Sequence, residues 1–443
     1  MRFCFAGVAV LGALLSLNGC EDEENQPRVS GPLPCDVQAV VESECSTCHG
    51  VEPKFGGPMS LMSTEDWHVP AVTDPAETMY HIAKERMNYR FVPDSEVSLQ
   101  HIPIGPMPPA PNQPLEGENL RIMNDWIDNG AFAKSTPGAC AAAPEEKPAP
   151  VPDPELDCTW HEFRAHADDR FDLPFKVGTA RDAYYNFTFK SPWDKTVYAR
   201  AFKPLIDNEK VLHHWLFFKK AGTLFRDGSV QISTGAHVGG QLINGWAPGG
   251  EPHFYDEKVG RILEPGYYNL EIHYNSDDPE AVDVSGMAVC YTEKEPEHVA
   301  ELIWLGTDAI LGDEASGICE PAEQTEPIHI LSVTPHMHTK GRHIKAVINR
   351  ADGSTDILHD HAFNFDTQAT YYFDEDVIIY PGDTITTTCT YSEPTIFGRG
   401  TSQEMCYLYT AAWPIGALRD NKLLSLIHGP NTCLGLIPPG LGD

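Results

Sequence analysis

Lysine and arginine are scarce in this chain, and that scarcity excludes a large class of partners. The 443 residues include 31 Lys and Arg against 64 Asp and Glu, which gives a formal net charge of -33 at pH 7. Nucleic-acid binding requires a basic surface, so no nucleic-acid partner is expected. The same balance argues against electrostatic binding to an anionic membrane, and we interpret the excess acid as a solvated surface.

The apolar run near the start is too short to cross a bilayer. It occupies residues 8–17, whereas a transmembrane helix needs roughly 20 residues. Arg2 before it and Gly19-Cys20 after it predict a signal peptide at residues 1–19, cleaved before a lipid-modified Cys20. The chain would then be an exported bacterial lipoprotein at the periplasmic face of a membrane or at the cell surface, attached only through its lipid. Ordinary secretion, with Cys20 removed or free, is the alternative.

Helical periodicity is rare beyond residue 157, where short alternating segments and turns are found instead. Alternating or β-branched stretches predict strands at residues 186–190, 267–274, 344–348 and 377–380. Many short strands with turn residues indicate antiparallel sandwiches of jelly-roll type. No internal sequence repeat accompanies them.

Shifts in composition divide the chain into segments. The Pro- and Ala-rich stretch at 135–156 predicts a semi-rigid linker. A second boundary is expected near residues 305–316, at Gly306 and Gly312. The predicted order is a hydrophilic tether at 20–33, a small domain at 34–134, the linker, and two β domains at 157–305 and 306–443.

A cofactor-attachment motif lies in the small domain. Cys45-Ser46-Thr47-Cys48-His49 has the spacing in which two thiols add to the vinyl groups of haem and the histidine binds the iron. A redox dithiol, or half of a zinc site with His49 incidental, is the alternative. Met107, in Gly-Pro-Met-Pro-Pro, is a candidate distal thioether ligand, in competition with Met79, His81, Met87 and His101.

An amphipathic pattern follows the motif and extends the interpretation. Residues 120–132 place Leu120, Met123 and Ile127 on one face and predict a helix that ends near Gly130. With the motif, residues 34–134 resemble a class I cytochrome c domain. That resemblance implies an all-α domain with one covalently attached haem c.

Histidines and one methionine form ordered groups in the second half of the chain. A single histidine among 19 is weak evidence, because most are core or surface residues. Imidazole and thioether together suit both oxidation states of copper, and five nitrogens with one sulfur make two three-coordinate sites. Such sites leave positions for O2, which predicts redox chemistry. The groups are His213-His214, His273, His336-Met337-His338 and Met405.

The alternation of side chains between the two faces of a strand has different consequences for each of these groups. Adjacent His213 and His214 would point to opposite faces of an ideal strand, so a distorted end or loop must bring both to one metal. His336 and His338 are two residues apart and share a face. In the stretch 267–274, His273 is expected opposite the core face.

The groups occur in a known order within longer motifs. The motifs resemble the copper type II, ascorbate-dependent monooxygenases, the family of dopamine β-monooxygenase and peptidylglycine α-hydroxylating monooxygenase. The similarity covers about residues 156–436 and implies two jelly-roll domains that each hold one copper and face a solvent-filled cleft. The motifs are His213-His214, Leu270-Glu271-Ile272-His273-Tyr274, Pro335-His336-Met337-His338-Thr339-Lys340-Gly341-Arg342 and Thr401-Ser402-Gln403-Glu404-Met405-Cys406-Tyr407-Leu408-Tyr409.

Residue by residue, the resemblance implies two ligand sets. His213, His214 and His273 would hold an electron-transfer copper. The copper that binds O2 would be held by His336, His338 and Met405, which are the candidate catalytic residues. The loop at 245–250, Gly-Trp-Ala-Pro-Gly-Gly, matches one often found between the second and third histidines, and a glycine turn around a packed tryptophan is the alternative.

Cysteine usage fits an oxidising compartment. The chain has 12 cysteines, and eight remain after those assigned to the signal, the lipid and the haem. Eight cysteines allow 105 connectivities, and an even number in an exported protein predicts disulfides. The resemblance and the domain division select Cys158–Cys290, Cys319–Cys433, Cys389–Cys406 and Cys35–Cys140.

The resemblance implies hydroxylation of a C–H bond of a small organic substrate with O2. Electrons would come from an ascorbate-like reductant or from a periplasmic donor through the haem. Peptide-amidating members carry an arginine where this chain has Thr334, which argues against a C-terminal glycine peptide as substrate, although Tyr409 matches a tyrosine of that pocket. A copper- and haem-binding electron-transfer lipoprotein without hydroxylase activity is the alternative function, and an adhesive scaffold would leave the His and Met spacing unexplained.

Overall fold

The structure is a computed structural model that describes most of the chain. The expected signal peptide, Cys20, His101 and nearly all of the linker lie outside the described residues. Among the described helices, none is both long and apolar enough to span a membrane. The described residues are 29–55, 57–71, 74–89, 106–109, 112, 114–133, 140, 154–232, 240–321, 325–365, 368, 370–398, 403–418 and 432–435.

The part before residue 134 forms a helical body with its own core. Trp67 and Trp126 meet edge to face there, with ring centroids 5.1 Å apart. The expected helix at 120–132 is present but runs from Gly117 to Asp128. It ends there because Gly130 has a left-handed backbone, with φ of 95°. The elements are α1 Cys35–Val40, η2 Val41–Cys45 (a π-helical turn), α2 Ser46–His49, α3 Thr64–His68, α4 Met79–Asn88 and α5 Gly117–Asp128.

The rest of the described chain consists of strands, as the alternating patterns predicted. All four stretches predicted as strands lie in or at the end of observed ones, in β3, β10, β16 and β18. The strands are β1 Thr159–Arg164, β2 Phe175–Lys176, β3 Ala180–Lys190, β4 Val197–Leu205, β5 Leu212–Lys220, β6 Val230–Ile232, β7 Gly240–Trp246, β8 His253–Phe254, β9 Val259–Leu263, β10 Tyr267–Ser276, β11 Val282–Asp283, β12 Gly286–Thr292, β13 His298–Thr307, β14 Leu311–Cys319, β15 Ile328–His336, β16 Gly341–Asn349, β17 Thr355–Ala362, β18 Tyr371–Ile379, β19 Thr384–Ile396, β20 Cys406–Trp413 and β21 Thr432–Leu434.

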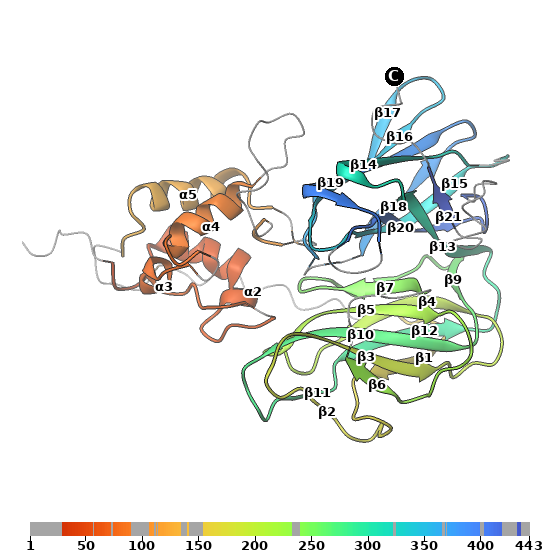
Figure 1. The fold of residues 1–443 in the computed structure, drawn as a ribbon, viewed down its shortest axis with the longest axis horizontal. Helices are drawn as coiled ribbons and strands as arrows, with labels where there is room; N and C mark the ends of the chain where they lie inside the picture. The colour runs from red at the N-terminus through yellow and green to blue at the C-terminus, as the bar shows by residue number, and fades with distance from the viewer. Residues whose placement is uncertain are drawn as a thin grey trace, which may run out of the picture.

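The strands build two sandwiches that share one long sheet (Figure 1). The long sheet has the order β1-β12-β4-β9-β13-β20-β15-β18, with β8 and β21 paired beside it. The sheet β6-β3-β10-β5-β7 packs on its first half, and β14-β19-β16-β17 packs on its second. Strand β13 joins the halves, because it pairs with β9 at one end and with β20 along the rest. The expected division between residues 305 and 306 falls inside this continuous strand.

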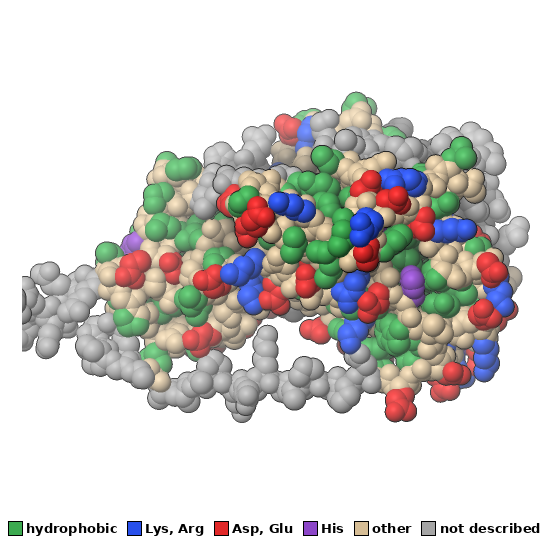
Figure 2. Space-filling model, turned by 90° about the horizontal axis from the view of Figure 1, so that it is seen from below, with side chains coloured by type: hydrophobic (Ala, Val, Ile, Leu, Met, Phe, Trp, Pro, Cys, Tyr) green, Lys and Arg blue, Asp and Glu red, His purple; other side chains and the backbone are tan. Residues whose placement is uncertain are grey.

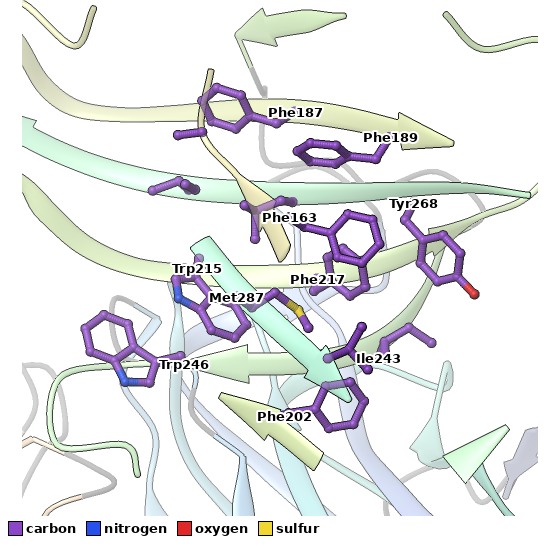
Figure 3. Packing of buried hydrophobic residues seen from close by; sticks show 14 of the residues in the cluster. Phe163, Phe187, Phe189, Phe202, Trp215, Phe217, Ile243, Trp246, Tyr268 and Met287 are labelled. Atoms are coloured by element: carbon purple, nitrogen blue, oxygen red, sulfur yellow. The ribbon is translucent and has the colours of Figure 1, made fainter. Parts of the chain in front are cut away.

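Aromatic rings fill the first sandwich (Figure 3). Phe163 is fully buried and lies 4.8 Å from Phe217 and 5.2 Å from Phe189, measured between ring centroids. Burial of each such ring stabilises the fold by roughly 1.5–3 kcal/mol relative to exposure. The predicted core face of β10 is confirmed, since Tyr268, Leu270, Ile272 and Tyr274 are all fully buried in this cluster.

A smaller apolar cluster joins the two sandwiches. Leu216 and Phe218 of β5 and Leu242 of β7 meet Leu302 of β13 and the ring of Tyr407 of β20. These β5 residues lie on the face opposite the first core, which is the face that carries His214. The side of β10 that bears His273 is therefore buried as well, with His273 only 4% exposed.

The described residues form four disulfides, and these are the pairs that the resemblance and the domain division selected. Cys35–Cys140 joins α1 of the helical body to Cys140, which lies in the stretch that follows that body. Cys158–Cys290 lies in the first sandwich, and Cys319–Cys433 and Cys389–Cys406 lie in the second.

Charged side chains of both signs lie interspersed on the surface (Figure 2). Many form exposed ion pairs, such as Lys258 Nζ with Glu297 Oε2 at 3.2 Å. Pairs of this kind contribute little to stability, so they are consistent with a solvating role for the acidic residues.

Candidate metal centres

A β-bulge brings His213 and His214 to the same side of the first sandwich. His273 of β10 pairs with His214 of β5, but the next residue, Tyr274, pairs with Leu212. His213 is the extra residue in this register shift, and a bulge re-aims the side chain that it displaces. This is the distortion that adjacent histidines needed in order to face one metal.

The three histidines of the first sandwich form a compact group. One ligand atom from each of His213, His214 and His273 lies within 4.8 Å of the others, which is close enough for one metal ion to bind all three. The two Nδ1 atoms of the adjacent pair are 3.1 Å apart. His214 and His273 are almost fully buried, so their orientation is fixed by packing.

An aromatic ring supports this group from the neighbouring strand. Tyr184 of β3 is the cross-strand partner of His273, and the two rings stack at 4.1 Å with an interplanar angle of 6°. On the other side of β5, Trp215 stacks with Trp246 at 6.4 Å. The histidines therefore lie between packed aromatic residues, which limits their rotamers.

The second group lies where β15 ends. Met337 points into the core of the second sandwich and is fully buried, so His336 and His338 point to the other face. Their rings are 5.5 Å apart between centroids and nearly perpendicular.

Hydrogen bonds fix which ring nitrogen each of these histidines offers. His336 Nδ1 donates to Gln368 Oε1 at 2.7 Å, and His338 Nδ1 donates to the carbonyl oxygen of Gln403 at 2.8 Å. Carbonyl oxygens can only accept, so each Nδ1 carries the proton and Nε2 has the lone pair. Partners of this kind orient metal-ligating histidines in many proteins.

Met405 comes next in the chain after residues that are bonded to His338. Strands β15 and β20 are antiparallel, with His336 opposite Tyr407, and the carbonyl oxygen of Gln403, two residues before Met405, accepts from the His338 ring. Glu404 Oε2 accepts the backbone N–H of His338 at 2.7 Å, and its Oε1 accepts that of Lys340 at 2.6 Å. Burial raises the pKa of Glu404 to about 7, against the lowering effect of these N–H donors.

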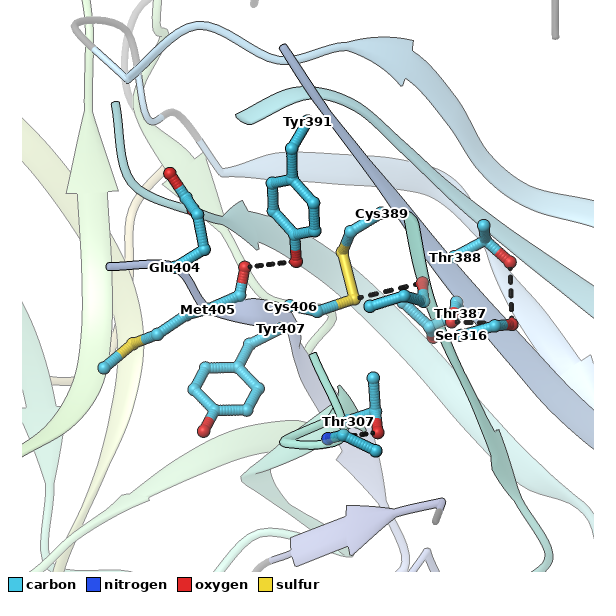
Figure 4. The surroundings of a disulfide bond; sticks show 12 residues. Thr307, Ser316, Thr387, Thr388, Cys389, Tyr391, Glu404, Met405, Cys406 and Tyr407 are labelled. Carbon is cyan, nitrogen blue, oxygen red and sulfur yellow. Dashed lines mark hydrogen bonds between the residues drawn. A yellow bond between two sulfur atoms is a disulfide. The ribbon is translucent and has the colours of Figure 1, made fainter. Parts of the chain in front are cut away.

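A disulfide anchors the strand that begins after Met405. Cys406 is bonded to Cys389 of β19, and Tyr391 of the same strand donates from its hydroxyl to the carbonyl oxygen of Met405 at 3.0 Å (Figure 4). In Figure 4 the Met405 side chain points away from the disulfide, so the sulfur of the thioether is presented on the other side of the backbone.

Two aromatic side chains lie between the groups. Tyr184, stacked on His273, is 6.3 Å from Phe365, and Phe365 is 6.4 Å from His338, measured between ring centroids. The segment that contains Phe365 and Gln368 also approaches the first sandwich, because the Tyr372 hydroxyl donates to Asn244 Oδ1 at 3.1 Å. Ring contacts through Tyr184 and Phe365 therefore connect the two histidine groups.

The Cys-x-x-Cys-His motif occupies η2 and α2 of the helical body. Cys45 and Cys48 are unbonded thiols on adjoining helical turns, and burial raises their pKa values to about 12 and about 11. His49 Nδ1 donates to the carbonyl oxygen of Met59 at 2.9 Å, which leaves its Nε2 as the metal-binding atom. Met107 is half-buried, and its backbone N–H donates to the carbonyl oxygen of Arg86 at 3.2 Å.

Sequence reasoning missed four supporting residues. Glu404 stood inside a quoted motif without a role, although a carboxylate directly before a candidate ligand was a usable signal. Tyr184, Phe365 and Gln368 are distant in sequence from the candidate ligands that they contact, and no local pattern marked them.

Thr334, which stands where peptide-amidating members carry an arginine, is 4% exposed and bonds to the Thr370 hydroxyl at 2.8 Å.

Comparison with known proteins finds relatives for part of the chain. Residues 312–422 match the family described as copper type II ascorbate-dependent monooxygenase, C-terminal domain. DBH-like monooxygenase protein 1 of Homo sapiens is 31% identical over 202 residues, which cover 39% of this chain and 33% of that protein. Dopamine beta-hydroxylase of Homo sapiens is 28% identical over 201 residues, covering 39% and 32%. These findings show that part of the chain is similar to the copper type II monooxygenase family.

The similarity to these relatives covers only part of this chain and part of theirs. The chain spans about a third of the length of these two curated relatives. The matched segment contains His336, His338 and Met405. Among solved structures, a Macrobrachium rosenbergii nodavirus overlaps with 7% identity, 62% of this chain, 95% of that chain and a TM-score of 0.18, which is too low to inform the fold.

Proposed function

We propose that this protein is a copper-dependent monooxygenase that hydroxylates a C–H bond of a small organic substrate with O2. The observation that carries the proposal is the compact group of His213, His214 and His273 in the first sandwich. It is supported by His336 and His338 of the second, whose ring orientations are fixed by hydrogen bonds, and Met405 is the proposed third ligand there. The overall change would be R–H + O2 + two electrons + two protons giving R–OH + H2O. An ascorbate-like reductant is one source of the electrons.

The donor atoms fit copper at both places. One ligand atom from each histidine of the first group lies within 4.8 Å of the others. The second group would offer two Nε2 atoms with the soft thioether of Met405, which favours Cu(I). Copper held by His336, His338 and Met405 would supply one-electron chemistry with O2, and copper held by His213, His214 and His273 would store an electron.

The chain itself contributes orientation and exclusion of water. Gln368 and the Gln403 carbonyl hold the two imidazoles of the second group in one tautomer. The apolar cluster that joins the sandwiches packs against Met405 and keeps water away from that side of the thioether. Because Thr334 is buried and bonded to Thr370, we do not propose a peptide carboxylate as the anchoring group of the substrate.

We further propose that the helical body is a cytochrome c-like domain with one haem on Cys45, Cys48 and His49. The residues fit this group, since two unbonded thiols precede a histidine whose Nδ1 is held by a backbone carbonyl. Met107 is the proposed distal ligand. Electrons from a periplasmic donor would then reach copper through the haem, one electron per iron oxidised and per copper reduced.

The proposed location is the outer side of a bacterial membrane, with a lipid on Cys20. Replacing Cys20 with Ser should release the protein into the soluble periplasmic fraction and abolish incorporation of labelled palmitate. Unchanged labelling in that variant would refute the anchor.

The decisive experiment measures metals and oxygen consumption on the purified full chain. Two coppers and one haem per chain, with O2 uptake that depends on an added substrate from a screen of small organic compounds, support the monooxygenase. Full metal content with no substrate-dependent O2 uptake would favour the electron-transfer lipoprotein instead. Absence of haem from pyridine haemochrome spectra would remove the cytochrome part and leave the copper part standing.

A further inference from the structure

One loop of the helical body docks on the first sandwich. This docking loop, residues 52–55, comes shortly after the Cys-x-x-Cys-His motif. The backbone N–H of Phe55 donates to the carbonyl oxygen of Glu209 at 2.7 Å. Two ion pairs flank that bond, Lys54 with Glu209 and Lys210 Nζ with Glu52 Oε2 at 2.9 Å. The charges alternate on both partners, so the loop fits the turn before β5 in one register.

Phe55 pays a conformational cost to make this contact. Its φ of 52° lies in the left-handed region, which is unfavourable for a bulky side chain. In that conformation its N–H reaches Glu209 while its ring packs edge-on against Trp246 at 5.9 Å and joins the core of the first sandwich. Backbone strain of this kind persists where surrounding contacts hold it, and it often marks a functional contact.

A second contact between the helical body and the first sandwich explains Gly249 in the loop at 245–250. Asn112 of the helical body donates from Nδ2 to the carbonyl oxygen of Pro248 at 3.0 Å. A Cβ at Gly249, whose φ is 96°, would lie 2.4 Å from Asn112 Oδ1. Gly249 therefore leaves room for Asn112 of the helical body. The helical body thus contacts the 245–250 loop twice, through Phe55 on Trp246 and through Asn112 on Pro248.

The docking loop is bonded to the motif and to the turn before the first histidine group. The Lys54 N–H donates to the carbonyl oxygen of Cys48 at 3.0 Å, and Phe55 next to it bonds to Glu209, four residues before His213. Trp246, under the Phe55 ring, stacks with Trp215, which follows His214 directly. A hydrogen-bonded path and an aromatic path thus both lead from the motif to the first histidine group.

We propose that the docking loop holds the helical body in a fixed place on the first sandwich and makes the turn at 208–212 the point where electrons enter the copper region. The inference rests on the proposed haem and copper functions and goes beyond them. It replaces a freely tethered donor with a docked one and assigns entry to His213, His214 and His273. The step transfers one electron, oxidising one haem Fe(II) to Fe(III) and reducing one Cu(II) to Cu(I).

A rival entry point exists near the second histidine group. The positive charge of Arg342, four residues after His338, lowers the pKa of Tyr89 at the end of α4, although burial raises it more. An electron path through these two residues would lead to His338 instead. The experiment must separate the two.

The test uses the full-length holoprotein and two readouts. The first is the first-order rate at which reduced haem is reoxidised by Cu(II) in stopped flow, and the second is the radius of gyration from X-ray scattering. The variants are Lys54→Glu, Glu209→Lys, their combination, Phe55→Gly and Tyr89→Ala. Lys84→Glu is the matched control, because Lys84 pairs with Asp128 inside the helical body.

Lys54→Glu should slow reoxidation roughly threefold to tenfold and increase the radius of gyration, because two carboxylates then oppose each other at a part-exposed contact. The charge-swapped double variant should restore both values, and Phe55→Gly should slow the rate without introducing charge. Lys84→Glu should change neither readout, and reduction of Cu(II) by ascorbate should be the same in every variant.

Unchanged rate and unchanged radius in both Lys54→Glu and Phe55→Gly would overturn the docking. A slow rate only in Tyr89→Ala would overturn the assigned entry point. A rate that rises with protein concentration would show transfer between molecules and would also overturn it. If unaltered protein never reoxidises its haem while ascorbate-driven O2 uptake persists, the haem supply fails and the monooxygenase proposal stands.

Discussion

Glu404 is bonded to the backbone N–H of His338 at 2.7 Å, although 66 residues separate them. The same carboxylate accepts the N–H of Lys340, and the next residue in the chain is Met405. One buried side chain therefore links the turn after His338 to the residue beside the thioether. The geometry of the second donor group depends on this link as well as on the three ligands themselves.

Replacing Glu404 with Gln tests that link. The amide can accept at one oxygen only, so one buried N–H loses its acceptor, at a cost of about 1–3 kcal/mol in the free energy of unfolding. Copper bound by the second group should be lost first in a dialysis series, while the first group retains its metal. Glu393→Gln is the control, since Glu393 is exposed and pairs with Lys340 Nζ at 3.0 Å. Equal copper retention in the two variants would count against the link.

Replacing Met405 with Ile should abolish turnover while sparing the fold. The side chain stays apolar, but the soft sulfur that favours Cu(I) is gone. Circular dichroism and the haem spectrum should match those of the unaltered protein, and O2 uptake with substrate should fall to background. Full activity in this variant would remove Met405 from the assigned oxygen site.

The disulfides should separate stability from metal binding. Replacing Cys389 and Cys406 with Ala opens a loop of 17 residues and should cost roughly 3 kcal/mol, whereas the 132-residue loop of Cys158–Cys290 should cost nearer 5. Only the first change should weaken copper binding at the second group, because Cys406 adjoins Met405. Chemical denaturation with copper analysis measures both, and equal copper loss in the two variants would contradict this division.

Tyr184 offers a test of support at the first group. Tyr184→Phe keeps the ring that stacks on His273, whereas Tyr184→Leu removes it. The Leu variant should bind copper there about tenfold more weakly, in line with the loss of a ligand-orienting neighbour, and the Phe variant should differ much less. Competitive chelator titration gives the affinities, and an unaffected Leu variant would mean that the strands alone position His273.

Acid should destabilise the β-body through buried neutral histidines. Burial, with the nearby charge of Arg261, lowers the pKa of His253 to about 3, and its ring stacks on Tyr372 at 3.6 Å. In the unfolded chain the pKa is about 6.5, so the unfolded state takes up a proton first as the pH falls. The stability from this group is complete above pH 6.5 and is lost between there and pH 3, amounting to about 2 kcal/mol between pH 7.5 and 5.

Denaturation at several pH values measures that slope. His253→Gln should be less stable at pH 7.5 but should show a shallower loss towards pH 5. His81→Gln, a change at an exposed histidine of α4, serves as the control. Parallel curves for unaltered protein and His253→Gln would disprove the contribution of this residue.

Periodic patterns and local spacing were sufficient for much of this protein. The alternation in β10 identified its core face, since a side-chain period of two assigns each residue to one side of a sheet. The two-residue spacing of His336 and His338 likewise placed both on one face. The identity of the donor atoms indicated copper before any geometry was known, and the resemblance together with the domain division gave the four disulfide pairs.

The tertiary structure decided what local pattern cannot encode. The bulge at His213 depends on pairing with β10, and the buried outer face of β10 depends on the second sandwich. Glu404, Gln368 and Phe365 reach their histidines only after chain folding brings distant segments together. Sequence thus determined the chemistry of the donors and the faces they occupy, because those follow from residue type and strand period. Long-range packing alone determined which donors meet and what holds them, because contacts between distant segments leave no periodic signal in the chain.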